Sequence, residues 1–293
     1  MAKAQFLERY RRLGHDLSGE EKTGLSIRAN TLKMSCHVLL SKLENLGAKP
    51  EEIKWLREGL FIDPSEYPFG SSFEYLLGFY TPQEAASQFP VEVLEPKEDE
   101  IILDMCAAPG GKTTQISAWM SNRGSLVAVD INRNRLYALE NNLERLGIEN
   151  CIVYRGDASE LDYGMQFDKI LLDAPCSGNY VVDKGWFSRR TLKDVEANAD
   201  KQRPLLSSAV RWLKEKGILI YTTCSLEPEE NELNIQWLLN NFNVDLIEIK
   251  GPGNPGLTDV FGITLDSRVS HCRRFWPDYT GTQGFFVAKV IKL

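Results

Sequence analysis

From residue 101 onward, short apolar runs alternate with longer stretches in which apolar side chains recur every three or four positions. The runs are predicted to be strands at 101–104, 125–130, 151–154, 169–172, 218–221, 244–249 and 284–290. The periodic stretches are predicted to be helices at 113–120, 132–146, 194–214 and 229–240. Because strands and helices alternate, we expect a Rossmann-like α/β fold with a seven-stranded, mostly parallel sheet.

The last two predicted strands follow each other without a helical stretch between them, so we expect them to form a terminal antiparallel hairpin. Residues 1–80 have another pattern, with a basic amphipathic helix that carries Phe6 and Tyr10 and a second helix near 37–46. We therefore expect a small α+β domain at 1–80 and a sheet domain at 81–293.

Composition limits the class of protein. Apolar residues make up 43% of the 293 positions, and no apolar run approaches the roughly 18 residues that a membrane helix needs. The amino terminus has no apolar core of signal-peptide length, so we expect a cytoplasmic protein. The six cysteines form no Cys-x-x-Cys pair and only three histidines are present, so we expect free thiols and no metal site.

The net charge of −7 argues against a protein that coats nucleic acid indiscriminately, although a local basic face can still bind it. Candidates for such a face are Arg9, Arg11, Arg12, Arg28, Lys33, Arg189, Arg190, Lys193, Arg268, Arg273 and Arg274. The alternative for each cluster is an ordinary solvated surface.

A glycine-rich turn follows the strand at 101–104 and contains Gly110, Gly111 and Lys112. A phosphate-binding P-loop would require glycine where this chain has Cys106, and Pro109 removes a backbone donor, so that interpretation is weak. The small residues still allow a ligand to approach the backbone closely.

Acidic residues end the next two strands. Asp130 is placed to accept hydrogen bonds from ribose hydroxyls, and Asp157 from an adenine amino group. A nucleoside held by carboxylates without a phosphate clamp is typical of S-adenosylmethionine, whose sulfonium charge Asp104 or Asp173 would stabilise. Each aspartate alone is as readily explained as a loop cap.

Cys176 and Cys224 lie in two different loops that follow strands, in Asp-Ala-Pro-Cys-Ser-Gly and Thr-Thr-Cys-Ser. A thiolate that adds to C6 of a pyrimidine makes C5 nucleophilic enough to attack a methyl donor. The nearby hydroxyls and loop amides can stabilise the thiolate of Cys224, and Cys176 is placed to act as the second acid/base group. Asp173 is placed to hydrogen-bond the base and so favour cytosine. Buried structural cysteines are the alternative, which we retain for Cys36, Cys151 and Cys272.

These motifs, together with the acidic run 227–232, resemble those of the Sun-type RNA cytosine-5 methyltransferases, and the similarity extends from about residue 28 to 289. The resemblance implies a class I methyltransferase fold, an RNA substrate (transfer RNA rather than ribosomal RNA), S-adenosylmethionine as cofactor and a monomeric enzyme. It also implies that Cys224 is the nucleophile, that Cys176 assists product release and that residues 1–80 bind RNA. The implied cofactor residues are Cys106, Ala107, Ala108, Pro109, Gly110, Gly111, Lys112, Asp130, Arg135, Asp157 and Asp173.

The chain departs from the family pattern at Pro277-Asp278, where relatives often have Pro-His, so a substrate contact is in question there. Two other functions are weighed. A relict RNA-binding scaffold would need a damaged motif, and none is found. Methylation of protein glutamine or of adenine would need an Asn/Asp-Pro-Pro-aromatic motif, and Asp173-Ala174-Pro175-Cys176 lacks the aromatic residue.

Overall fold

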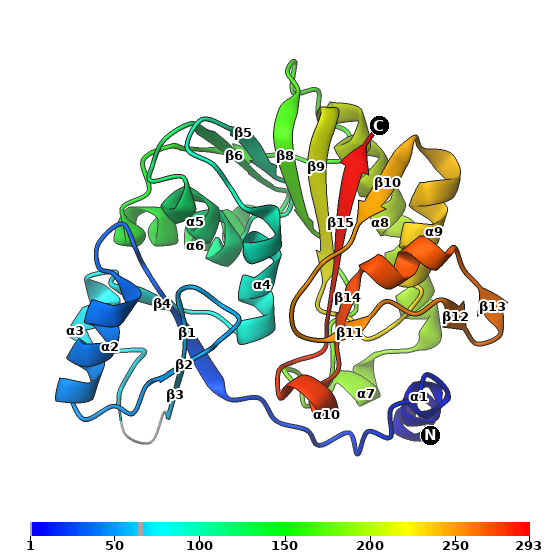
Figure 1. Cartoon of the computed structure of the whole chain (residues 1–293), viewed down its shortest axis with the longest axis horizontal. Coiled ribbons are helices and arrows are strands. Elements are labelled where there is room, and N and C mark those ends of the chain that lie inside the picture. Colours follow the sequence, from blue (N-terminus) through cyan, green and yellow to red (C-terminus); the bar gives the residue numbers. More distant parts are fainter. Residues whose placement is uncertain (1, 64–66) are drawn as a thin grey trace. The chain divides into compact units, whose positions relative to one another are not determined.

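The computed structural model describes residues 2–63 and 67–293 (Figure 1). The chain divides into two compact units: residues 24–170, which we name the contiguous unit, and residues 1–23 together with 171–293, which we name the two-segment unit. Met1 and residues 64–66 of the predicted N-terminal domain lie outside the described residues. The domain boundary at residue 80 remains a prediction.

The first part of the contiguous unit is a four-stranded antiparallel sheet in the order β2 (Glu51–Glu52), β3 (Gly59–Ile62), β1 (Leu25–Ala29) and β4 (Tyr80–Pro82). The short helix α3 (Phe73–Leu76) precedes β4. Helix α2 (Cys36–Asn45) begins at Ser35, whose side chain accepts the N–H of Val38, and it buries Leu39 and Leu43. The helix predicted near 37–46 is thereby confirmed.

The second part contains β5 (Ile101–Asp104), β6 (Ser125–Asp130) and β7 (Cys151–Arg155), which pair in parallel. Helices α4 (Ala85–Leu94), α5 (Gly111–Trp119) and α6 (Arg133–Leu146) accompany them. Helix α6 is capped by Asn132 and ends at Gly147, which adopts φ of 75° as its expected stop. Its apolar face packs on Ala107 and Ala108, and thereby supports the loop after β5.

Strand β8 (Phe167–Asp173) begins in the contiguous unit and ends in the two-segment unit. In the latter, β9 (Leu213–Thr223) pairs antiparallel with β15 (Phe285–Lys292) along its length (Figure 1). Strands β10 (Val244–Ile247) and β14 (Arg273–Phe275) pair antiparallel with opposite ends of β15, and β11 (Asn254–Pro255) pairs with β14. The seven predicted strands are therefore present, but among the described residues β11 and β14 also join the sheet, which has nine strands instead of the predicted seven.

The predicted terminal hairpin is correct in its pairing, because Val244 lies opposite Lys292. It is not a tight hairpin, since residues 248–284 lie between the two strands. That segment holds β11, β14, the small hairpin of β12 (Asp259–Val260) and β13 (Ile263–Thr264), the 3₁₀ helix η1 (Ser267–His271) and α10 (Pro277–Thr280). The segment has no long apolar period, which is why no element was predicted there.

Helices α7 (Trp186–Arg189), α8 (Leu192–Trp212) and α9 (Glu232–Asn241) follow strands of the two-segment unit. Helix α1 (Ala2–Arg12) belongs to the same unit and buries Phe6 and Tyr10 in a cluster with Trp186 and Trp276. The ring of Phe6 meets that of Trp186 edge-on at 4.6 Å. Within the described residues, no helix combines the length and apolar character that crossing a membrane requires.

Candidate active site

The glycine-rich loop connects β5 to α5 in the contiguous unit. Gly110 has φ of 103°, and a Cβ there would lie 2.7 Å from Cδ1 of Leu139, so the turn excludes other residues. Asp104 is buried and accepts a hydrogen bond of 2.7 Å from the Thr113 hydroxyl, which ties the end of β5 to the first turn of α5. A contact between Asp104 and the sulfonium group of a cofactor remains a prediction.

Asp130 ends β6 and is almost fully buried. Its Oδ2 accepts the N–H of Ala108 at 3.2 Å and lies 3.4 Å from Nη1 of Arg135, while Oδ1 accepts the N–H of Asn132 at 2.8 Å. Arg135 also donates to the carbonyl of Ala108. The structure thus brings together three of the predicted cofactor residues.

Asp157 lies just beyond the end of β7, where its Oδ1 accepts both the N–H and the hydroxyl of Ser159, at 2.9 and 2.6 Å. The N–H of Gly156 donates to the carbonyl of Asp130 at 3.3 Å, so the β6 and β7 ends are joined directly. Lys112 is buried and donates to the hydroxyl of Ser87 at 2.9 Å, which places its ammonium against α4.

The two predicted cysteines meet in the two-segment unit. Sγ of Cys176 lies 3.2 Å from Sγ of Cys224, and Asp173 ends β8 three residues before Cys176. The hydrogen bond with Cys224, together with burial, raises the pKa of the Cys176 thiol well above its usual value. Cys176 therefore keeps its proton at neutral pH and can donate it toward the sulfur of Cys224.

The hydroxyls around Cys224 are used elsewhere than expected. Thr222 donates to the carbonyl of Phe286 at 2.6 Å and Thr223 donates to Oδ1 of Asn231 at 2.5 Å. The Ser225 hydroxyl donates to Glu230 at 2.8 Å. Because each hydroxyl carries one proton, these three bonds fix the shape of the loop and leave none of those protons for the sulfur.

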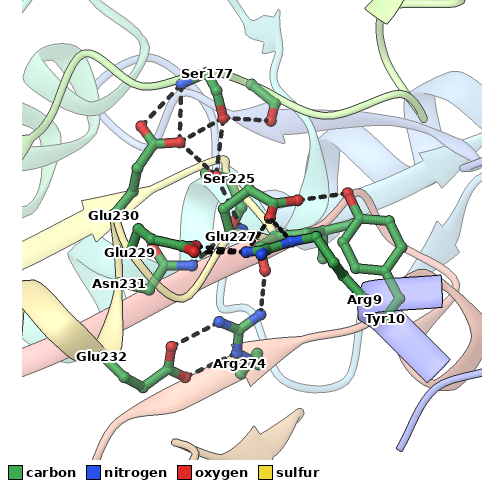
Figure 2. Close-up of polar contacts among 12 residues, drawn as sticks. Arg9, Tyr10, Ser177, Ser225, Glu227, Glu229, Glu230, Asn231, Glu232 and Arg274 are labelled. Carbon is green, nitrogen blue, oxygen red and sulfur yellow. Dashed lines mark hydrogen bonds and ion pairs between the residues drawn. The ribbon is translucent and has the colours of Figure 1, made fainter. Parts of the chain in front are cut away.

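Acidic residues after Cys224 anchor separate segments of the two-segment unit (Figure 2). Glu227 accepts from Arg9 at 3.2 Å and from the Tyr10 hydroxyl at 2.7 Å, which holds α1. Glu232 and Arg274 form a fully buried, bidentate pair with distances of 2.8 and 2.6 Å. Burial raises the pKa of Glu227 to about 7, although Arg9 and Tyr10 oppose this shift. In the sequence, only the family resemblance points to this acidic run, and it implies no role for the individual carboxylates.

Two members of the expected basic face, Arg28 and Arg274, are not available at a surface. Arg274 is buried in its pair with Glu232, and Arg28 is buried and donates to Gln83, to the carbonyl of Gly111 and to Thr114. Lys33 donates to the carbonyls of Leu77 and Arg145 at 2.8 and 2.7 Å. Arg28 and Arg274 satisfy acceptors inside the protein, so these two are wrong as phosphate-binding candidates, whereas Lys33 is exposed.

The departure at Pro277-Asp278 brings in a histidine from another part of the chain. The Asp278 carboxylate lies 3.1 Å from Nδ1 of His15, and the His15 ring stacks on Trp276 with centroids 4.0 Å apart. A histidine therefore lies beside this segment although it comes from the N-terminal part of the chain.

The parallel strands β5, β6 and β7 and the glycine-rich loop after β5 have the arrangement of α/β nucleoside-binding folds, and two thiols lie side by side in the two-segment unit. A family model described as 16S rRNA methyltransferase RsmB/F matches residues 91–291. The chain therefore belongs to the RsmB/F family of S-adenosylmethionine-dependent RNA methyltransferases, which confirms the resemblance seen in its motifs.

Two curated relatives illustrate the range of the family. The chain is 38% identical to a mouse 28S rRNA (cytosine-C(5))-methyltransferase over 92% of its own length and 35% of that protein. It is 36% identical to the tRNA (cytosine(49)-C(5))-methyltransferase of Pyrococcus abyssi, over 91% of this chain and 88% of that one. The chain thus spans about a third of the mouse protein.

Two solved structures confirm the predicted fold class. A methyltransferase homologue from Pyrococcus horikoshii has a TM-score of 0.88 at 38% identity and is matched over 99% of both chains. NSun6 from the same organism, solved with SFG, an analogue of S-adenosylmethionine, has a TM-score of 0.81 at 30% identity. That match covers 93% of this chain and 91% of NSun6.

Proposed function

We propose that this protein transfers a methyl group from S-adenosylmethionine to C5 of a cytosine in RNA, with Cys224 as nucleophile. The observation that carries the proposal is the 3.2 Å separation of the Cys176 and Cys224 sulfurs on loops that follow two strands. Inert packing cysteines need no partner thiol, whereas addition to and elimination from a nucleobase requires a nucleophile and an acid/base group side by side.

Cys224 acts first. Its thiolate forms a bond to C6, and the electron pair displaced from the C5–C6 double bond makes C5 nucleophilic. When bound, S-adenosylmethionine supplies an electrophilic methyl group. After the transfer, the C5 proton must leave, the double bond must re-form and the C6–sulfur bond must break so that Cys224 departs as a thiolate.

Cys176 is suited to remove the C5 proton. Its pKa is raised chiefly by the hydrogen bond with Cys224, and that cause disappears once the Cys224 sulfur is bonded to C6. Burial still raises the pKa of Cys176 at that stage, but the thiol loses its proton to solvent more readily than while it is bonded to Cys224, and the resulting thiolate can accept the C5 proton. Asp173, which ends β8 just before this loop, is proposed to bind the cytosine amine.

The residues of the contiguous unit fit the cofactor. Two carboxylates, Asp130 and Asp157, follow neighbouring parallel strands and offer acceptors of the kind that ribose hydroxyls and an adenine amine need. The positive φ of Gly110 shapes the turn beside them, and Ile131 exposes its apolar side chain next to Asp130. We propose that residues 106–112 and Arg135 complete this pocket, with Arg135 fixing the loop through Ala108. Asp173 belongs to the two-segment unit, and its contact with the cofactor remains a prediction.

Transfer RNA is the proposed substrate. The match over 88% of the P. abyssi tRNA methyltransferase supports it, while the 28S rRNA relative leaves ribosomal RNA as the alternative. We propose that the enzyme acts as a cytoplasmic monomer, that residues 1–80 contribute to RNA binding and that the target cytosine lies in a loop or junction, where unstacking costs least.

The test is to map 5-methylcytosine in total cellular RNA after incubation with the protein and labelled S-adenosylmethionine. We expect label at C5 of cytosines in transfer RNA, and none with the Cys224→Ala variant. Equal labelling by that variant would refute the role of Cys224, and label confined to ribosomal RNA would refute the substrate.

A further inference from the structure

A single buried carboxylate, that of Glu230, collects donors from both cysteine loops (Figure 2). Its Oε1 accepts the Ser225 hydroxyl at 2.8 Å and also the Ser177 hydroxyl. Its Oε2 accepts the Ser177 N–H at 2.9 Å and a Gln202 side-chain N–H at 2.9 Å. Glu230 lies in the same β9–α9 loop as Cys224, six residues further along, and reaches across to the loop of Cys176.

The serines that it binds are the direct neighbours of the reactive sulfurs. Ser177 follows Cys176 and Ser225 follows Cys224, and their hydroxyl oxygens lie 3.0 Å apart. Gln202 also donates to the carbonyl of Pro175 at 2.9 Å, so the peptide groups on both sides of Cys176 are held. The position of one sulfur relative to the other therefore depends on this carboxylate.

We propose that Glu230 is a positioning residue that keeps the sulfur of Cys176 against that of Cys224. The catalytic consequence rests on the proposed function, whereas the effect on the distance between the thiols does not. Four donors converge on Glu230, as an ionised acceptor requires. Burial raises the pKa of Glu230, and the hydrogen bonds from these donors offset part of that rise.

A second connection joins the loops at the level of the main chain. The Asn179 side chain donates to the carbonyls of Cys224 and Gly284, at 2.8 and 3.1 Å. It holds the backbone of Cys224 but contacts neither serine hydroxyl. Loss of Glu230 is therefore expected to loosen the sulfurs without separating the loops completely.

The orientation of an amide at position 230 can be worked out from the donors. The backbone N–H of Ser177 cannot reverse, and the Gln202 amide is held because its oxygen accepts from Tyr221 and Asn234. A glutamine at position 230 would therefore turn its oxygen toward these two donors and its NH₂ group toward the two serine hydroxyls. Hydroxyls can accept as well as donate. Glu230→Gln should therefore retain most of the geometry, whereas Glu230→Ala removes it.

The geometric test uses dibromobimane, which becomes fluorescent when it alkylates two neighbouring thiols, with the bridged peptides identified by mass spectrometry. We expect Glu230→Ala to slow the bridging of Cys176 to Cys224 on the order of tenfold. A displacement of about 1 Å between two positioned reacting groups can lower the reaction rate by that factor or more. Glu230→Gln should bridge at nearly the wild-type rate.

Glu229→Gln is the matched control, because Glu229 is the adjacent carboxylate and binds Arg9 at 2.6 Å instead of the serines. Wild-type bridging in a folded Glu230→Ala variant would overturn the proposal. If circular dichroism shows that Glu230→Ala is unfolded, Ser177→Ala replaces it, with slower bridging expected and an unchanged rate contradicting the proposal.

The catalytic test measures two quantities, the amount of covalent protein–RNA adduct that accumulates and the amount of methylated RNA that is released. With Glu230→Ala we expect the adduct to form and its release to slow, so the ratio of adduct to methylated product rises on the order of tenfold. A proportional loss of both would contradict a positioning role. If the wild-type protein methylates no RNA, the proposed function fails, while the bridging result still decides the geometric inference.

Discussion

The sulfurs of Cys176 and Cys224 lie 3.2 Å apart, although 48 positions separate the two residues in the sequence. Each follows a different strand, and each is followed by a serine that binds the same glutamate. The contact couples the two thiols, because the proton of one is hydrogen-bonded to the other. Bond formation at the Cys224 sulfur should consequently change how readily Cys176 gives up its proton.

Replacing Cys176 separates the two halves of the proposed reaction. The Cys176→Ala variant should still form the bond between Cys224 and RNA but should release product at least about a hundredfold more slowly, the typical loss when an acid/base group is removed. A covalent complex that survives denaturing electrophoresis should then accumulate. Rapid turnover without such a complex would exclude Cys176 from product release.

The glycine-rich loop is tested by Gly110→Ala. Its φ of 103° and the 2.7 Å approach of a Cβ to Leu139 mean that alanine must distort the turn. We expect the Kd for S-adenosylmethionine, measured by isothermal titration, to rise at least about tenfold, equivalent to about 1.4 kcal/mol. The control is Gly281→Ala, where φ is 65° but no atom lies within 4 Å of the added Cβ. Equal Kd values for the two variants would argue that the loop does not bind the cofactor.

Docking of α1 is tested by Phe6→Ala. Phe6 is fully buried against Trp186, whose indole N–H donates to the carbonyl of Ser177 at 2.8 Å. The resulting cavity should lower the free energy of unfolding by about 3–5 kcal/mol in urea titrations. Gln5→Ala, at an exposed position of the same helix, should change it by less than about 0.5 kcal/mol. Similar values for both would show that α1 is not part of the core.

Glu227 predicts a specific dependence of stability on pH. Burial raises its pKa from 4.5 to about 7, against the opposing effects of Arg9 and Tyr10, while Glu229 adds to the rise. Between these values the folded protein holds a proton that the unfolded chain has lost. Its contribution to stability is therefore complete below about pH 4.5 and is lost as the pH rises through about 7, with a slope of at most about 1.4 kcal/mol per pH unit.

The measurement compares urea unfolding of the wild type with that of Glu227→Gln, which cannot titrate. As the pH rises from about 5 to about 7.5, the wild type should lose stability relative to the variant. A difference that stays constant over this range would mean that Glu227 has an ordinary pKa.

The strands and helices of the sheet could be predicted because apolar periodicity is local. The helix at 132–146 carries its own signals, with Asn132 as its N-cap and Gly147 at its end. The two cysteine loops could be located because each directly follows a predicted strand. The 3.2 Å approach of the sulfurs needed only that β8 and β9 be neighbours.

The roles of the charged residues could not be predicted, because they depend on partners distant in the sequence. Arg274 lies 42 positions from Glu232 and Arg28 lies 86 from Thr114, so both looked like surface cations. Glu230 binds Ser177 across 53 positions. A carboxylate in an acidic run is usually solvated, and only the folded loops reveal that this one is buried among donors.

The most direct test of the account uses an RNA substrate that carries 5-fluorocytosine, whose fluorine cannot leave as a proton does, so that the covalent intermediate persists. Mass spectrometry of the complex formed with S-adenosylmethionine should place the methylated nucleotide on the peptide containing Cys224. Attachment to Cys176 or to another residue, or the absence of any adduct under conditions of active methyl transfer, would contradict the account.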